Sequence, residues 1–337
     1  MPWPIRGEEP SLVRRIKREP KLTVIGIDVG ATKIAAAIVG REGKVSGETV
    51  RERREADGPE EVLAIMIEAV RTSLRKYRGL RLDAIGVGIA GQVEARTGRI
   101  HYSPNLRWEN FPLGDRLRTA FHVPVVVAND VQAAVVGEWR HGAGIGESDL
   151  FMLVIGTGVG GGAVIGGKLL TGSTNTFGEV GHLTLVAGGR PCHCPNRGCF
   201  EAYVGGWAVA ERARELVARE LEAAEPLVRR AGSIDRITAQ TVTEAYRAHD
   251  ALAINLIRDT IGYLETGIVG IMNTFNPRRL ILGGGMIQGL PDVIPGILAA
   301  IRDRCQPAAA GVEVVRAGLK RHSAIVGAAS LARERLN

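Results

Sequence analysis

Three of the four cysteines fall within positions 192–199, spaced as C-x-C-x4-C, and His182 lies ten residues before the first of them. Thiolate and imidazole are ligands that Zn²⁺ prefers, and four of them complete a closed tetrahedral site. The cluster predicts a structural zinc ion held by His182, Cys192, Cys194 and Cys199, with a disulfide or plain buried thiols as the alternative. Cys305 stands apart and is interpreted as a buried thiol.

Two polar residues, Asn129 and Asp130, end the apolar run "VVVAND". A carboxylate at a strand end that faces a cleft can act as a general base when a hydroxyl lies within hydrogen-bonding reach. The neighbouring amide of Asn129 can both donate and accept, which suits a polyol. The alternative is an Asx turn or a helix N-cap that leads into "VQAAVVGEW".

Three glycine-rich turns follow apolar runs: "DVGATK" at 28–33, "GTGVGGG" at 156–162 and "LGGG" at 282–285. Glycine lets the backbone approach a phosphate closely, with N–H groups free to donate, although each turn alone also fits a tight hairpin. Gly156, Gly158 and Gly161 match G-x-G-x-x-G, with Glu179 about 20 residues on. A second strand is expected after this turn in place of a helix, which disfavours a dinucleotide site and an NAD-dependent dehydrogenase. No P-loop motif is present.

The elements that must position these residues repeat along the chain. β-branched apolar runs predict strands at 22–30, 34–40, 82–93, 123–130, 278–285 and 312–317, and two strands joined by a glycine turn within 149–167. Helical spacing predicts a helix at 60–77. One helix face carries Ile257, Ile261, Leu264, Ile268, Ile271 and Phe275. A strand–glycine turn–strand opening in each half, followed by helices, indicates a duplicated α/β fold of two domains with a cleft between them.

Composition and charge indicate whether the chain is a soluble, membrane-spanning, secreted or nucleic-acid-binding protein. The 337 residues are 45% apolar and 23% charged, which is ordinary for a soluble globular chain, and no uninterrupted apolar run is long enough to span a membrane. The N-terminus is basic, contains several prolines and has no apolar stretch of the kind found in a secretory signal peptide. We therefore interpret it as an extension and expect a cytoplasmic protein. The net charge of +7 comes from scattered residues, which argues against nucleic acid as a partner.

Taken together, the sequence resembles the ROK family of sugar kinases within the actin-like (ribonuclease H-like) ATPase superfamily. From residue 22 onward the matching pieces occur in family order: "GIDVGATKI", "GIAGQV", "NLRW", "VVVAND", "VIGTGVGGG", "GEVGH", "CHCPNRGCFEAY" and "LILGGG". The "GEVGH" and cysteine segments are specific to the family, whereas the glycine turns are shared across the superfamily. Pro195 is a departure, because the family usually has glycine after the second cysteine.

The resemblance implies roles for individual residues. Asp130 would be the catalytic base, and Asp28 would help to hold the Mg²⁺ that accompanies ATP. The implied sugar-binding residues are Gly91, Asn105, Asn129, Asp130, Glu179, His182 and Glu201. The implied contacts to ATP are Asp28, Gly30, Thr32, Lys33, Thr157, Gly158, Gly284 and Gly285. One ring nitrogen of His182 would bind zinc while the other faces the sugar, so zinc would act as a scaffold and not as a Lewis acid.

The implied reaction is ATP-dependent phosphorylation of a hexose, with glucose as the first candidate. N-acetylglucosamine, N-acetylmannosamine, mannose and fructose remain alternative substrates, and polyphosphate or ADP remains open as the donor. A sugar-responsive repressor is disfavoured, because about 20 residues before the first strand are too few for a DNA-binding domain. The implied organisation is an extension at 1–20, a small domain at 21–127 plus 318–337, and a large domain at 128–317. A homo-oligomer, a dimer or a tetramer, is also expected.

Overall fold

Two five-stranded sheets dominate the computed structural model, which describes residues 22–336 except 55, 78, 105 and 220–223. The expected extension at 1–20 and Asn105 lie outside the described residues. The first sheet is formed by β1 (Val24–Val29), β2 (Lys33–Val39), β3 (Val45–Glu52), β4 (Ala84–Ile89) and β8 (Val125–Asn129). The second is formed by β9 (Leu150–Ile155), β10 (Val159–Ile165), β11 (Lys168–Leu169), β12 (Arg279–Gly283) and β13 (Glu313–Arg316).

The two sheets have the same topology. Their strand orders are β3-β2-β1-β4-β8 and β11-β10-β9-β12-β13. In each, the first strand pairs antiparallel with the second and parallel with the fourth, as β1 does with β2 and β4, and β9 with β10 and β12. The duplication predicted from the repeated glycine turns is therefore confirmed. A small third sheet, not predicted, contains β5 (Gln92–Val93), β6 (Ile100–Ser103) and β7 (Trp108–Phe111).

The helices follow the strands in both halves. Those of the first half are α1 (Pro59–Arg75), α2 (Leu113–Phe121) and α3 (Asp130–His141). The second half contains α4 (Glu201–Val204), α5 (Gly206–Arg219), α6 (Glu225–Ala231), α7 (Ala239–Arg247), α8 (Ala251–Phe275), α9 (Gly285–Gly289), α10 (Val293–Arg304) and α11 (Ser323–Glu334). Short 3₁₀ turns are η1 (Val180–His182), η2 (Ile234–Arg236), η3 (Pro307–Ala309) and η4 (Lys320–His322).

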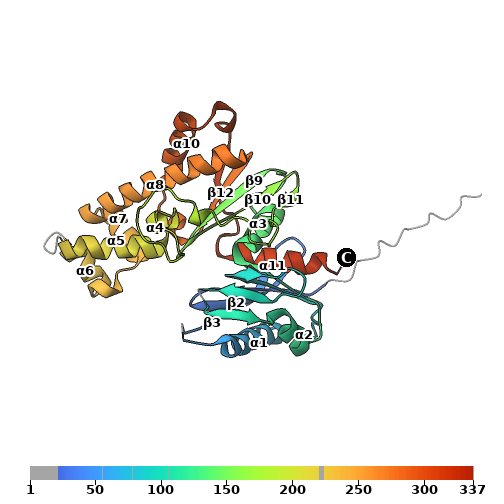
Figure 1. Ribbon diagram of the computed structural model, residues 1–337. Coiled ribbons are helices and arrows are strands. Elements are labelled where there is room, and N and C mark those ends of the chain that lie inside the picture. Colours follow the sequence, from blue (N-terminus) through green and yellow to red (C-terminus); the bar gives the residue numbers. More distant parts are fainter. Residues whose placement is uncertain (1–21, 55, 78, 105, 220–223, 337) are drawn as a thin grey trace, which may run out of the picture.

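Each sheet has its own apolar core. In the first, α1 and α2 cover one face, and the C-terminal helix α11 returns to the other face and packs beside α3 (Figure 1). α11 lies unusually close to the sheet because Gly26 and Gly86 have no side chain. A Cβ at those positions would lie 2.0 Å from the Ile325 carbonyl oxygen and 1.9 Å from that of Ala328.

The long helix α8 is the centre of the second core. Of its predicted apolar face, Ile257, Leu264, Ile268 and Ile271 are fully buried, and Ile261 and Phe275 pack against the same cluster. Phe200 lies against Gly267 of this helix, so the residues just before α4 are anchored to the core. Cys305 is only half-buried, contrary to its interpretation as a buried thiol, because it lies at the C-terminal end of α10.

A buried carboxylate, Glu138, joins α3 to the segment that leads into α11. One of its oxygens accepts hydrogen bonds from the backbone N–H groups of Ala143 and Gly318, at 2.8 and 2.9 Å. The other accepts from the N–H of Leu319 at 2.9 Å and from the Ser323 hydroxyl at 2.6 Å. The side chain is fully buried. Glu138 therefore fixes the point at which the chain passes from the second sheet back to the first.

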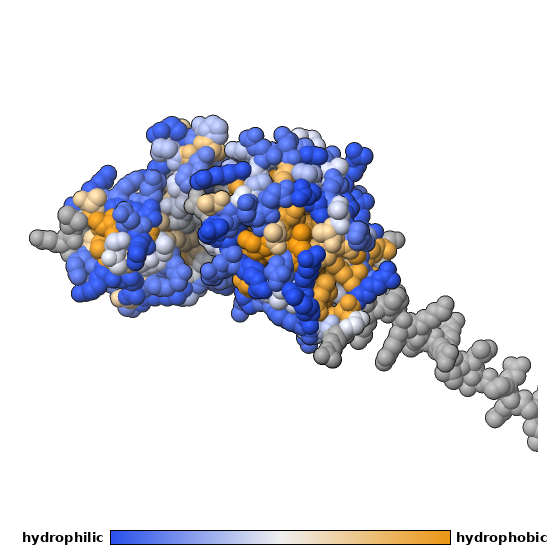
Figure 2. All heavy atoms as spheres, turned by 90° about the horizontal axis from the view of Figure 1, so that it is seen from below, coloured by the Kyte–Doolittle hydropathy of each residue, from blue (hydrophilic) through white to orange (hydrophobic). Residues whose placement is uncertain are grey.

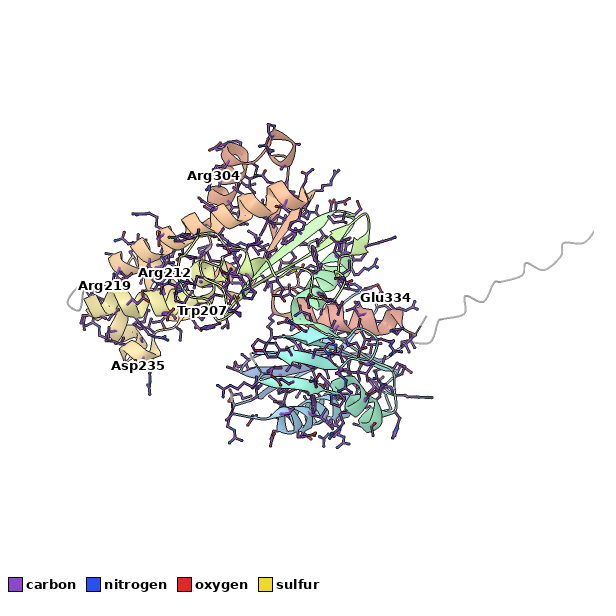
Figure 3. All side chains as sticks on the ribbon, viewed as in Figure 1. Trp207, Arg212, Arg219, Asp235, Arg304 and Glu334 are labelled. Carbon is purple, nitrogen blue, oxygen red and sulfur yellow. The ribbon has the colours of Figure 1, made fainter. Side chains whose placement is uncertain are left out.

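Glu138→Ala should lower the free energy of unfolding by about 3 kcal/mol or more, because four donors would lose a charged acceptor in a buried place. Urea denaturation followed by circular dichroism measures the loss. The matched control is Glu334→Ala on α11, since that exposed side chain makes only a 3.4 Å pair with Arg140 (Figure 3). Equal stability of the two variants would contradict the anchoring role.

The face of the molecule seen from below is mainly polar (Figure 2). Seen from below, apolar residues gather on the lobe that contains α1 and α2, among charged ones (Figure 2). Within the part of the chain that is described, no helix is long and apolar enough to cross a membrane.

Candidate active site

The carboxyl ends of three parallel strands bring the first group of polar residues together. β1, β4 and β8 run in the same direction, with Asp28 opposite Gly88 and Ile89 opposite Asn129. Parallel strands end at the same edge of a sheet, where ligands usually bind in open α/β folds. Gly88 lies beside the start of α3: a Cβ there would be in ordinary van der Waals contact with Asp130, 3.5 Å from its Cα.

Asn129 is the N-cap of α3. Its side-chain oxygen accepts hydrogen bonds from the N–H groups of Val131 and Gln132 at 2.9 and 3.2 Å. Its amide nitrogen donates to the Gly91 carbonyl oxygen at 3.3 Å, where Gly91 has a φ of +144° that favours glycine. The helix-cap interpretation is thus confirmed, and the cap fixes the orientation of the next residue, Asp130.

Two carboxyl groups at this edge have raised pKa values. Burial raises the pKa of Asp28 to about 7, and the nearby charge of Asp130 adds to the effect. Burial also raises the pKa of Asp130; the Val131 and Asp130 backbone N–H groups oppose this rise, and the charge of Glu179 adds to it. Desolvated carboxylates in close proximity are typical of functional sites.

The predicted glycine turns lie at strand ends in both halves. Gly30 N–H donates to the Lys33 carbonyl oxygen at 2.9 Å, and Thr32 and Lys33 are exposed. Gly156 N–H donates across the second turn to the Gly158 carbonyl oxygen at 2.9 Å, with Thr157 exposed at its tip. This turn joins two strands, as predicted, and does not open a helix.

The third turn requires glycine. Gly284 follows β12 with a φ of +92°, and a Cβ there would lie 2.2 Å from the Ile155 carbonyl oxygen. Gly285 then begins α9. Because Ile155 precedes the β9–β10 turn, the second and third turns lie next to each other at one edge of the second sheet.

The four predicted metal ligands converge. Their ligand atoms, one from each of His182, Cys192, Cys194 and Cys199, lie within 4.8 Å of one another. Sγ of Cys194 is 3.6 Å from Sγ of Cys199, and Sγ of Cys192 is 3.7 Å from Nδ1 of His182. All four cysteines are free thiols, so no disulfide competes for them.

The segment around these ligands turns back on itself. Cys192 N–H donates to the Asn196 carbonyl oxygen at 3.2 Å, and Pro195 occupies the turn without preventing it. Burial raises the pKa of Cys192, and raises that of Cys199 to about 12 with help from the neighbouring thiols. At Cys194 the Asn196 N–H group and the other thiols outweigh burial, so its pKa lies below the usual value.

His182 has two different faces. Nδ1 points to the thiols, whereas Nε2 lies 3.9 Å from a carboxylate oxygen of Glu179. Burial raises the pKa of Glu179; nearby His182 lowers it, and Glu201 raises it again. The imidazole therefore lies between the thiol cluster and the Glu179 carboxylate. That its second nitrogen faces the sugar stays a prediction.

Glu201 is already bonded to protein on both sides. One oxygen accepts from the Val159 N–H at 2.7 Å, and the other accepts from the Trp207 indole N–H at 3.0 Å. The sequence did not indicate these partners. A ligand contact at Glu201 would use the remaining lone pairs of the same oxygens.

The electrostatic influences form a continuous series. The charge of Asp130 raises the pKa of Asp28, the charge of Glu179 raises that of Asp130, and the charge of Glu201 raises that of Glu179. Asp28 lies in β1 and Asp130 directly follows β8, both strands of the first sheet, whereas the two glutamates follow strands of the second sheet. The structure thus brings the predicted carboxylates of both halves to one region. Trp207 and Glu138 are additional residues that sequence reasoning missed.

A hollow of about 320 Å³ lies elsewhere, between α5 and α8. Its charged groups pair with one another: Arg190 bonds Glu215 at 2.6 and 2.9 Å, and Arg212 bonds Asp259. The hollow contains none of the predicted site residues, so it does not compete with the carboxylate region as the candidate active site.

Comparison with known proteins agrees with this geometry. The profile of the ROK family matches residues 24–335. The chain is 32% identical to a glucokinase from Thermotoga maritima, over 94% of this chain and 99% of that protein. It also matches a crystal structure of a ROK family glucokinase from Streptomyces griseus in complex with glucose and AMPPNP, with a TM-score of 0.82 and 32% identity over 93% of this chain and 99% of that one. A ROK hexokinase from Thermus thermophilus matches with a TM-score of 0.76 and 30% identity, over 94% and 99%.

Proposed function

Because the chain belongs to the ROK family and has its two-domain actin-like fold, we propose that it is an ATP-dependent glucokinase that transfers the γ-phosphoryl group to the 6-hydroxyl of glucose. The observation that carries the proposal is the meeting of Asp28, Asp130, Glu179 and Glu201 beside the glycine turns. Phosphoryl transfer depends on positioning and charge stabilisation, which such a set can supply.

Asp130 is the proposed base. Asp130 begins α3 directly after the Asn129 cap. Its carboxylate accepts a hydrogen bond from the Val131 N–H at 3.0 Å and lies within the electrostatic reach of Glu179. A raised pKa makes the ionised carboxylate a stronger proton acceptor. Asn129, Gly91, Glu179, His182 and Glu201 are the proposed partners of the other sugar hydroxyls, together with Asn105, which lies outside the described residues.

The phosphates of ATP are proposed to lie along the turns that contain Gly30, Thr32, Lys33, Thr157, Gly158, Gly284 and Gly285. Backbone N–H groups that are not used within such turns favour anions. The Gly30 N–H is already used, because it donates to the Lys33 carbonyl oxygen. Asp28 fits the magnesium that accompanies ATP, because a desolvated carboxyl group with a pKa near 7 is ready to ionise beside a cation. The metal would neutralise developing charge on the phosphates.

The thiol cluster fits zinc in its geometry. Tetrahedral bonds of the usual Zn–S and Zn–N lengths place two sulfurs about 3.8 Å apart and a sulfur about 3.6 Å from a nitrogen. Two of the six distances between ligand atoms, 3.6 Å and 3.7 Å, correspond to these values, and all six lie within 4.8 Å. With four protein ligands, a bound zinc ion would hold the Glu179–His182 segment and the start of α4 in one arrangement, and would leave no position for a substrate.

We infer that residues 21–127 with 318–337, and residues 128–317, form two domains that close over glucose, with hinges near 126–130 and 316–320. The bonds from Glu138 to Gly318 and Leu319 support a defined crossing at the second place. Closure would exclude water as an acceptor. A cytoplasmic location and assembly into a dimer or a tetramer stay predictions.

The activity should depend jointly on pH and magnesium. Protonation of Asp28 removes a metal partner, and protonation of Asp130 removes the base, so kcat/KM should fall as the pH drops. The loss of the metal partner should occur as the pH passes through about 7, the pKa of Asp28. A cation favours the ionised form of Asp28, so raising the magnesium concentration should move this fall to lower pH. Rate profiles at two magnesium concentrations measure the shift. Superimposable profiles would contradict a role for Asp28 in metal binding.

A panel of hexoses and phosphoryl donors, assayed by coupled detection of ADP, tests the substrate assignment. Glucose with ATP should give the highest kcat/KM. The panel should include N-acetylglucosamine, N-acetylmannosamine, mannose and fructose, with polyphosphate and ADP as alternative donors. A clear preference for another sugar would overturn the glucose assignment but leave the kinase proposal in place.

A further inference from the structure

We propose that Trp207 is a positioning residue that orients Glu201 and couples the zinc-binding segment to the β9–β10 turn; this rests on the proposed function for its effect on catalysis. Trp207 is the second residue of α5 and lies at the inner end of that helix, while Arg219 lies at its outer end (Figure 3). Three separate interactions meet on this one residue.

The first interaction is with the turn. The backbone N–H of Trp207 donates to the Thr157 carbonyl oxygen at 3.0 Å, and that of Gly206 donates to the Gly156 carbonyl oxygen at 2.9 Å. Gly206 has to be small, since a Cβ there would lie 2.7 Å from the Gly156 oxygen. The start of α5 is therefore bonded directly to the turn proposed to contact ATP.

The second interaction is with Glu201. The Trp207 indole N–H donates to one carboxylate oxygen at 3.0 Å, and the Val159 N–H donates to the other at 2.7 Å. Gly158 leaves space for this carboxylate, because a Cβ there would lie 2.5 Å from it. Two donors on opposite oxygens define the orientation of the carboxylate, and a hydrogen bond to a charged group is stronger than one between neutral groups.

The third interaction is with the metal segment. His193 lies between Cys192 and Cys194, and its ring stacks on Trp207 with centroids 3.9 Å apart and planes at 20°. The position of His193 depends on its two neighbours, which are proposed zinc ligands. A change in the metal segment would therefore reach Glu201 and the β9–β10 turn through the indole ring.

Substitutions separate these contacts. Trp207→Phe keeps an aromatic ring for His193 but removes the N–H that orients Glu201, so KM for glucose should rise about tenfold with a smaller change in kcat. His193→Ala removes the stack and keeps the N–H, so its KM should stay within about threefold of wild type. The matched control is Trp139→Phe, which also removes an indole N–H bonded to protein, at 2.9 Å to the Glu147 carbonyl oxygen.

Fluorescence tests the coupling without any turnover. Removing zinc from the full-length protein with a chelator should change tryptophan emission in wild type and in Trp139→Phe. The change should be lost in Trp207→Phe and reduced in His193→Ala. An identical change in wild type and Trp207→Phe, or an unaltered KM for glucose in Trp207→Phe, would overturn the positioning role. If wild type shows no kinase activity, the proposed function fails, while the emission result still decides whether Trp207 senses the metal segment.

Discussion

Asp130→Asn should reduce kcat by roughly 10²–10⁴-fold, the usual contribution of a positioned general base. The side chain keeps its shape and lies at the start of α3, where the Asn129 cap fixes the backbone. The variant loses proton acceptance and also the negative charge that adds to the raised pKa of Asp28. Glucose affinity, measured by calorimetry, should stay within about threefold of wild type, because an amide can still hydrogen-bond a hydroxyl.

A matched surface variant separates chemistry from general damage. Asp115→Asn removes a carboxylate that is exposed on α2 and pairs with Arg118 at 2.7 Å, a contact of little energetic value. Its kcat should equal that of wild type. If Asp130→Asn turned over within about threefold of wild type, Asp130 would not be the base.

Cys194→Ser should remove the metal and weaken glucose binding in the same variant. The freshly purified wild-type protein should contain about one zinc ion per chain, as four protein ligands imply. Loss of one thiolate opens the cluster and frees His182, whose second nitrogen lies 3.9 Å from a Glu179 oxygen, so the Glu179–His182 segment loses its fixed position. KM for glucose should rise about tenfold or more, the usual range for losing groups that orient a site.

Cys305→Ser is the control, because this thiol lies outside the cluster at the end of α10. Zinc content by elemental analysis and KM should both be unchanged in it. Wild-type protein without zinc would refute the metal site. Loss of zinc from Cys194→Ser with an unchanged KM would refute the role of zinc in positioning the sugar-binding residues. Zinc would then only stabilise the fold of this segment.

The structural features that depend on local sequence were predicted correctly. "VVVAND" ends β8 at Asn129, and the repeated apolar run with a glycine turn forms β9 and β10. The spacing of His182 and the three cysteines anticipated a real cluster, because short loops keep ligands close together in space. The predicted face of α8 is buried for the same reason: helical periodicity is a local property.

The parts that were missed depend on contacts between distant segments. Glu138 lies in a largely apolar helix. Its role as a hydrogen-bond acceptor follows only from the fold, which brings the N–H groups of Gly318 and Leu319 beside it. Trp207 and Glu201 contact each other because the chain turns sharply at Gly205, between α4 and α5. The small sheet of β5, β6 and β7 was missed because its strands are short and carry exposed residues such as Tyr102.

Direct measurement of both products tests the proposed reaction. The purified protein would be incubated with Mg·ATP and glucose, and ADP and glucose 6-phosphate would be quantified separately. ADP and glucose 6-phosphate should form in equal amounts, and ADP formation should be far slower when glucose is omitted, since water would be excluded from the closed site. ADP released at the same rate without sugar, or no glucose 6-phosphate at all, would contradict the assignment as a glucokinase.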